Sequence, residues 1–119
     1  MEKINIEEKL ATFADHWSPK IVGELNGQYV KLAKVKGEFV WHSHENEDEL
    51  FYVIKGNLTI ELRDRKVVLS AGEMFIVPRK VEHRPTAEEE THILLFEPKK
   101  TAHTGKVKSE LTVKVQDHI

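Results

Sequence analysis

Residues 37–56 read GEFVWHSHENEDELFYVIKG. Within this stretch His42 and His44 lie two positions apart, and Glu49 opens an apolar run that ends at Gly56. Residues two apart on a strand project from the same face, so both imidazoles can bind one metal ion, with nitrogens about 2.1 Å from it. Glu49 brings a carboxylate across a short turn. The stretch therefore predicts two strands, a turn and three ligands of one metal site.

Short apolar segments separated by turn signals extend on both sides of this stretch. Asn26-Gly27 is a strong hairpin signal, and Gly56-Asn57 marks a second turn. Regular spacing of this kind indicates an all-β fold, an antiparallel sandwich or barrel. The predicted strands span residues 20–25, 28–36, 38–44, 49–55, 58–62, 66–70, 73–77, 81–85 and 91–97.

A second stretch, residues 72–83, reads GEMFIVPRKVEH. It begins at Gly72, turns at Pro78 and ends at His83. This strand-turn-strand unit can cross the mouth of the same barrel, and we therefore expect His83 to supply a fourth ligand.

Together the two stretches resemble the cupin superfamily, whose motifs contain Gly, His-x-His, Glu and Gly, and then Gly, Pro, Gly, His and Asn. Lys80 stands where a glycine is common and Ala87 where an asparagine is common, and Gly37 is followed by four residues before His42 where five are usual. If the turn at Lys80 needs a left-handed residue, this departure costs about 1 kcal/mol. The matching positions are Gly37, His42, His44, Glu49 and Gly56, then Gly72, Pro78 and His83.

The 15 residues between the motifs, 57–71, are typical of small microbial single-domain cupins. The run 41–56 and the segment 97–105 also resemble small cupins of the type-2 group that are labelled mannose-6-phosphate isomerase-like. The resemblance implies a double-stranded β-helix, or jelly roll, with one divalent metal ion inside the barrel and commonly a homodimer.

One amphipathic helix is expected before the strands, over residues 4–17, with Asn5 as its N-cap and Ser18-Pro19 as its end. We predict a single domain over residues 1–119, with a barrel over about 20–98 and a tail over 101–119. The apolar positions that recur at helical spacing are Ile6, Leu10, Phe13 and Trp17. In the tail, alternating apolar residues indicate a potential edge strand: Leu111, Val113 and Val115.

Strand alternation predicts which residues face the metal. If His42 and His44 point inward, Phe39 and Trp41 on the same strand point outward. If Glu49 points inward, the residues of its strand alternate between the two faces. Phe51 and Val53 then point inward, and Leu50, Tyr52 and Ile54 point outward. Such an apolar outer face requires a cover, and we expect the helix and a partner subunit to provide it.

Other polar residues near the motifs have alternative roles. Asp48 becomes a substitute ligand if the turn shifts by one residue, although a charged hairpin tip is usually only solvated. His92 is in phase with Leu94 and Phe96, so it either points into the barrel near the metal or is a satisfied structural histidine. Arg84 is expected at the surface, and His16, His103 and His118 have no companions that make them ligands.

Composition excludes several classes of function. The formal net charge is -2 and the lysines are dispersed, so a nucleic-acid partner is not expected. No apolar run reaches the roughly 18 residues of a membrane span, and the acidic, polar start is unlike a signal peptide. The chain has no cysteine, so any metal is held by histidines and carboxylates. We expect a cytoplasmic protein.

Three imidazoles and one carboxylate suit Fe, Mn, Ni, Cu, Co or Zn, and an octahedral ion keeps two open positions. This predicts a metal-dependent enzyme, an oxygenase or isomerase, acting on a small oxygenated molecule such as a diketone, enediol or sugar, with Glu49 as its base. The alternatives are a non-catalytic module that binds a small molecule or metal chelate, and a structural barrel without metal.

Overall fold

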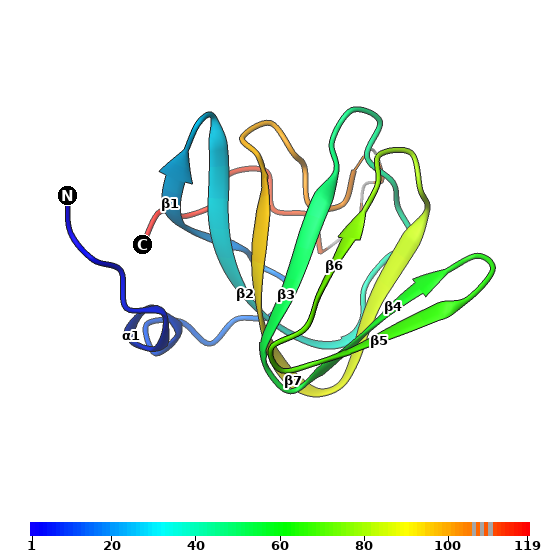
Figure 1. Ribbon diagram of the computed structural model, residues 1–119, viewed down its shortest axis with the longest axis horizontal. Helices are drawn as coiled ribbons and strands as arrows, with labels where there is room; N and C mark the ends of the chain where they lie inside the picture. Colours follow the sequence, from blue (N-terminus) through cyan, green and yellow to red (C-terminus); the bar gives the residue numbers. More distant parts are fainter. Residues whose placement is uncertain (106, 108, 110) are drawn as a thin grey trace.

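The computed structural model describes residues 1–105, 107, 109 and 111–119. Over these residues one short helix is followed by seven strands that curl into a barrel (Figure 1). The prediction of a mostly β fold with a short N-terminal helix is confirmed. The elements are α1 (Ile6–Leu10), β1 (Lys20–Leu25), β2 (Gln28–Glu38), β3 (Glu49–Lys55), β4 (Asn57–Leu62), β5 (Lys66–Ser70), β6 (Met74–Val77) and β7 (His83–Pro98).

β7 organises the barrel because it pairs with three other strands. β2 runs antiparallel along it, from Gln28 opposite Pro98 to Glu38 opposite Thr86. The second half of β7 pairs with β3 and its first residues pair with β4. The remaining pairs are also antiparallel: β1 pairs with β2, β6 with β3, and β5 with β4. The sheet therefore folds around β7 and encloses the inward faces of β2, β3 and β7.

Strand β3 alternates between the two faces as its sequence predicts. Glu49, Phe51 and Val53 are buried in the barrel, whereas Leu50 and Tyr52 are partly exposed on the outer face. Because each residue faces opposite to its neighbours, the carboxylate of Glu49 enters the barrel interior. The buried apolar core is formed by Trp17, Ala33, Val35, Phe39, Phe51, Val53, Leu58, Ile60, Leu69, Val77, Ala87, Ile93 and Leu95.

The predicted helix over residues 4–17 is wrong in its second half. The helix spans only Ile6–Leu10, where the Asn5 side chain accepts a hydrogen bond from the backbone N–H of Glu8. Trp17 has a left-handed backbone, with φ of 57°, and its N–H donates to the carbonyl of Lys34 on β2. This turn sends the indole into the barrel instead of over its outer face. Leu10 and Phe13 do cover the outer face, where they pack near Val22, Leu32 and Leu94.

The expected strand over residues 38–44 is also corrected. β2 ends at Glu38, after a register shift next to Gly37, whose φ is 83°. Beyond it the pairing with β7 is reduced to a hydrogen bond from the Phe39 N–H to the Pro85 carbonyl and an isolated bridge between His42 and His83. Because strict alternation is lost, Phe39 points inward and is buried, against the prediction, and stacks on Trp17 with ring centroids 4.6 Å apart.

Trp41 lies on the outside, as predicted. Its ring is covered by the guanidinium of Arg63, 3.8 Å from the ring centroid, and by that of Arg84 at 5.5 Å. Arg84 also pairs with Glu61 at 3.1 Å, so it lies on the outer face of the barrel.

No edge strand forms in the described part of the tail, residues 101–105, 107, 109 and 111–119. Leu111 packs against the barrel core, while Val115 is 84% exposed, so the two do not share a sheet face. The chain end instead returns to β1, where the N–H of Ile119 donates to the carbonyl of Ile21. Within the described residues, no helix is long and apolar enough to cross a membrane.

Lys80 has a left-handed backbone, with φ of 68°, and its N–H donates to the His44 carbonyl at 2.7 Å. A side chain strains this conformation by about 1–2 kcal/mol, and the greater unfolded-state entropy of glycine offsets part of the gain. We expect Lys80→Gly to raise the free energy of unfolding by about 0.5–1 kcal/mol, measured by urea denaturation. Arg79→Gly, next to it, serves as the control and should not stabilise. A loss of stability in Lys80→Gly contradicts the prediction.

Candidate metal centre

Four buried side chains converge at one end of the barrel interior. His42, His44, Glu49 and His83 each offer one ligand atom, and these atoms all lie within 4.8 Å of one another. Glu49 Oε1 is 3.5 Å from Nε2 of His44 and 3.5 Å from Nε2 of His83. Ligands about 2.1 Å from a shared ion are separated by about 3 to 4 Å, so this spacing suits a single ion. The sequence-predicted residues are therefore brought together as a cluster consistent with a metal site.

Hydrogen bonds fix the orientation of two of the imidazoles. Nδ1 of His42 donates to the carbonyl of Val40, and Nδ1 of His83 donates to that of Val81, both at 2.9 Å. Because a carbonyl only accepts, each proton lies on Nδ1 and the lone pair of the neutral ring lies on Nε2. Backbone carbonyls orient metal-binding histidines in this way in many proteins.

The three Nε2 atoms are the strongest sign that the residues fit a metal. In His42, His44 and His83, Nε2 is buried and has no hydrogen-bond partner among the described residues. Buried polar atoms are nearly always paired, so three orphaned nitrogens around one carboxylate need an occupant. A divalent cation satisfies all three lone pairs and the carboxylate charge at once.

The electrostatics of the site favour the protonation states in which His42 and Glu49 can bind a metal ion. Burial, and next the neighbouring His83, lower the pKa of His42 to about 4. Burial acts to raise the pKa of Glu49, but the adjacent Glu97 and the rings of His44 and His83 hold it well below its usual value of 4.5. A neutral imidazole and a charged carboxylate are the forms that bind a cation.

Sequence reasoning missed a buried ion pair behind Glu49. Glu97 on β7 is 1% exposed and interacts with Glu49, and Lys31 Nζ on β2 lies 2.7 Å from Oε1 of Glu97. Burial, and next the charge of Glu49, raise the pKa of Glu97 well above 4.5. Glu97 is in phase with the buried Ile93 and Leu95, and an acid on an apolar strand face was the available signal.

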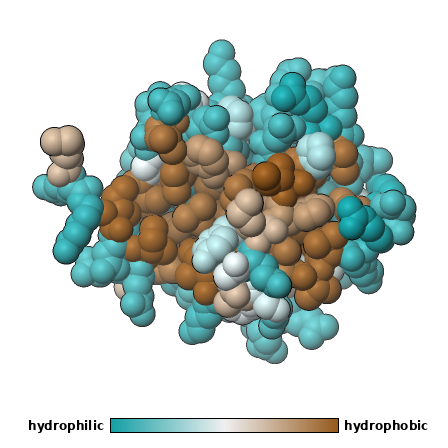
Figure 2. Space-filling view, viewed as in Figure 1, coloured by the Kyte–Doolittle hydropathy of each residue, from teal (hydrophilic) through white to brown (hydrophobic). Residues whose placement is uncertain are grey.

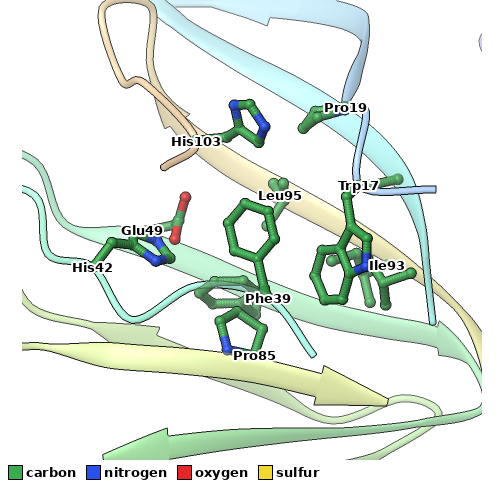
Figure 3. Close-up of a pocket in the computed structure, with 12 residues that line it drawn as sticks. Trp17, Pro19, Phe39, His42, Glu49, Pro85, Ile93, Leu95 and His103 are labelled. Atoms are coloured by element: carbon green, nitrogen blue, oxygen red, sulfur yellow. The ribbon is translucent and has the colours of Figure 1, made fainter. Parts of the chain in front are cut away.

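A second missed residue is His103, which lines a small cavity beside the cluster. Figure 3 shows His103 on the far side of the Glu49 carboxylate from His42, with Phe39 next to them. The cavity is about 30 Å³, and its remaining walls are apolar, including Trp17, Phe39, Phe51, Ile93 and Leu95. Burial lowers the pKa of His103. No local pattern marked His103, because the tail reaches the site only through the tertiary fold.

Other candidate residues lie away from the cluster. Asp48 is exposed and accepts a hydrogen bond from the backbone N–H of Arg79 at 2.8 Å, so it is not a substitute ligand in this structure. His92 does not point into the barrel: it lies on the outer face of β7, with Nε2 3.4 Å from a carboxylate oxygen of Glu90. His16 bonds the other oxygen of Glu90 at 2.8 Å.

The Cupin domain model matches residues 28–97, which include all four residues of the cluster. The chain belongs to the cupin family. A crystal structure of a cupin-2 domain protein from Shewanella frigidimarina is 48% identical, with a TM-score of 0.80, covering 81% of this chain and 94% of that one.

Two curated relatives bear on function. The Bacillus subtilis protein YdbB, whose function is uncharacterized, is 35% identical over 95 residues, which are 79% of this cupin and 78% of YdbB. The 3-hydroxyanthranilate 3,4-dioxygenase of Xenopus laevis is 28% identical over 102 residues, 79% of this cupin. This cupin spans only 36% of that enzyme, so the relation is distant and partial.

Proposed function

We propose that this cupin binds one divalent metal ion through His42, His44, Glu49 and His83 and is a metal-dependent enzyme, of oxygenase or isomerase type, acting on a small oxygenated molecule. The observation that carries the proposal is the convergence of three buried, unpartnered Nε2 atoms on one carboxylate. The similarity of this cupin to a dioxygenase over 102 residues supports an enzyme of the oxygenase type.

When bound there, the ion supplies a Lewis acid or an oxygen-binding centre with open positions, and Fe, Mn, Ni, Co, Cu and Zn all accept this ligand set. The protein contributes orientation and water exclusion. Phe39, Phe51 and Trp17 form an apolar wall beside Glu49, which keeps bulk water from the reacting molecule. Glu49 is the base of the proposed site, and the buried pair of Glu97 and Lys31 lies behind it.

Metal analysis followed by turnover assays tests this proposal. Protein purified without chelator is expected to contain close to one divalent ion per chain. After reconstitution with each candidate metal, oxygen uptake or product formation is measured with diketones, enediols and sugars. Absence of bound metal rejects the proposal and supports the structural barrel.

A non-catalytic binding module is the second candidate, and the small size of the cavity, about 30 Å³, favours it. So little space accepts a few atoms next to the ion but does not readily contain a whole sugar. Tight binding of a metabolite without turnover, detected by mass spectrometry of the natively purified protein, identifies the module.

We also propose that two copies pair through the outer face of β3, β6 and β7. Register places Met74, Tyr52 and Leu94 in one row across the strands, and Ile76, Leu50 and Phe96 in the next. Met74 is 55% and Ile76 49% exposed, and Figure 2 shows apolar residues gathered over this face. An apolar face of this kind is typical of a homodimer interface.

The test is a charge placed in the face. Ile76→Lys is expected to convert a dimer to a monomer in sedimentation velocity, because an unpaired ammonium is costly to bury. Val68→Lys, at an apolar position on β5 that is 62% exposed, is the control and should leave the dimer intact. A wild-type monomer at high concentration contradicts the proposal.

A further inference from the structure

Two of the cluster histidines lie on a loop and are nevertheless buried. His42 and His44 belong to the segment between β2 and β3, yet they are only 3% and 4% exposed. Loops usually run over the surface of a protein, so buried imidazoles on this loop need a cover. The cover has to come from another part of the chain.

Residues 100–105, here named the strap, pack on this loop. Gly105 has φ of 61°, and a Cβ built there would lie 2.2 Å from the carbonyl oxygen of Ser43, between His42 and His44 in sequence. Real Cβ atoms do not approach a carbonyl so closely, so only glycine permits this contact. A surface hollow of about 160 Å³ lies between the two segments and is lined by loop residues, including His44, and by strap residues, including Gly105. The strap therefore closes this end of the barrel over the two histidines.

The strap lies on the loop without a hydrogen bond to it among the described residues. Its backbone N–H groups donate within the strap and to the carbonyl of Pro98. Its side chains bond the rest of the tail: Nε2 of His103 donates to the carbonyl of Leu111 at 2.8 Å, and the hydroxyls of Thr104 and Thr112 are 2.9 Å apart. Lifting the strap from the loop therefore breaks packing contacts but keeps these hydrogen bonds.

The side chains that the strap buries are mainly polar. Thr101, His103 and Thr104 are 5%, 6% and 1% exposed. Thr101 Oγ1 and His103 Nδ1 are buried and have no hydrogen-bond partner among the residues that the structure describes. A buried polar atom without a partner costs free energy, which is regained when the atom meets water. Segments that bury little apolar surface open at low free energy, so the strap should open more readily than the strands below it.

Access to the cluster requires some part of the protein to move. All four side chains are buried, and the cavity that His42 and Glu49 line has a volume of only about 30 Å³. That volume accepts about one water molecule. An ion, or a molecule bound to it, cannot reach the cluster while the closed arrangement persists, and the strap is the weakly attached element at this end of the barrel.

We propose that the strap is a lid on the metal centre, which lifts to admit the ion and a small molecule and closes over them. This inference rests on the proposed metal binding. The closed lid excludes water from the bound molecule. Because only the open form exchanges the ion, the rates of metal binding and release are both proportional to the population of that form.

Cobalt exchange tests the lid. Binding to the metal-free protein, and release into excess chelator at a rate independent of chelator concentration, are followed by visible absorption in a stopped-flow instrument. Gly105→Ala adds a Cβ where Ser43 leaves no room, so we expect both rates to rise about tenfold and the dissociation constant to stay unchanged. Gly27→Ala is the matched control, because Gly27 also has a positive φ, of 76°, but no atom lies within 4 Å of its added Cβ. This control should keep the wild-type rates.

Thr101→Val is expected to act in the opposite direction. Valine keeps the shape of the side chain and removes the buried hydroxyl that has no partner, which stabilises the closed form. Both rates should therefore fall about fivefold. Most substitutions destabilise a protein, so a general loosening of the tail does not explain slower exchange. This variant also decides the question if Gly105→Ala does not fold.

The outcomes distinguish the lid from the proposed function. Unchanged exchange rates in either folded variant overturn the lid and leave the metal site intact. A dissociation constant that changes through the release rate alone means that the strap positions the ligands, and it also overturns the lid. A wild-type protein that binds no cobalt overturns the metal site and, with it, the inference.

Discussion

Chelation of the metal from the wild-type protein is expected to lower its thermal midpoint by about 15 °C, and His83→Ala is expected to show no such response. A ligand present at a thousand times its dissociation constant stabilises the folded state by about 4 kcal/mol. An unfolding entropy of about 2.1 cal/mol/K per residue gives about 0.25 kcal/mol/K for this chain, which converts that energy to the expected shift. The midpoint is measured by calorimetry with and without chelator.

His83 is the ligand whose loss is most informative. It is fully buried, at the start of β7, and pairs with the backbone of His42. Its truncation also leaves a cavity, which lowers stability by itself. The quantity to compare is therefore the difference between metal-loaded and chelated protein for each variant, not the midpoint of either.

His16→Ala supplies the control for this experiment. His16 bonds Glu90 on the surface, away from the cluster, so the chelator-dependent shift should remain at its wild-type size. The assignment of the four ligands is contradicted if chelator does not change the thermal midpoint of the wild-type protein. It is also contradicted if the His83→Ala variant keeps the full shift.

The cluster could be predicted because its geometry is mostly local. His42 and His44 share one loop, Glu49 opens the next strand, and the isolated pairing of His42 with His83 closes the set. Each position is defined by short spacing from a turn glycine or proline. The prediction thus needed the order of the strands, not their exact register.

Residues that depend on register or on tertiary docking were not predicted. Lys31 meets Glu97 only because β2 pairs with β7 so that Tyr29 lies opposite Glu97 and Lys31 opposite Leu95. His103 reaches the site through the docking of Gly105 on Ser43, which no periodicity encodes.

Backbone irregularity explains the two errors in side-chain direction. Trp17 fits a helical period and Phe39 fits a strand period, yet both enter the barrel. A positive φ at Trp17 and another at Gly37, two residues before Phe39, interrupt each regular element. Periodic patterns cannot reveal such single-residue breaks, and the two rings fill the barrel end beside the site.

Removal of Lys31 is expected to destabilise the protein by about 3–5 kcal/mol, because it leaves a buried acid without its cation. The side chains of Lys31 and Glu97 are 2% and 0% exposed, so water cannot replace the lost partner. Urea denaturation of Lys31→Met measures the loss. Lys99→Met breaks an exposed pair with Glu24, 2.8 Å apart, and should change stability by less than about 1 kcal/mol.

A double variant tests whether the cost lies in the uncompensated acid. Lys31→Met combined with Glu97→Gln removes both charges and keeps a side-chain amide that can donate to Glu49. Neutral replacement of a whole buried pair is often tolerated, so most of the lost stability is expected to return. A double variant as unstable as Lys31→Met alone shows instead that the lysine matters through its packing.

The loss in Lys31→Met depends on pH with a definite sign. Burial and the charge of Glu49 raise the pKa of Glu97 well above 4.5, and Lys31 opposes that rise. Without Lys31 the folded pKa of Glu97 rises further, so between the two folded pKa values the variant keeps a proton on Glu97 that the folded wild-type protein and the unfolded chain have both released. Folding of the variant takes up this additional proton, so its deficit in the free energy of unfolding grows as pH rises through that range.

Chelated Lys31→Met should therefore be less stable, relative to the wild-type protein, at about pH 8 than at about pH 5. Urea titrations across this range measure the slope. Because glutamine does not titrate, the double variant should lose most of the added slope. A Lys31→Met variant whose deficit is constant over the range shows that Glu97 does not hold the extra proton.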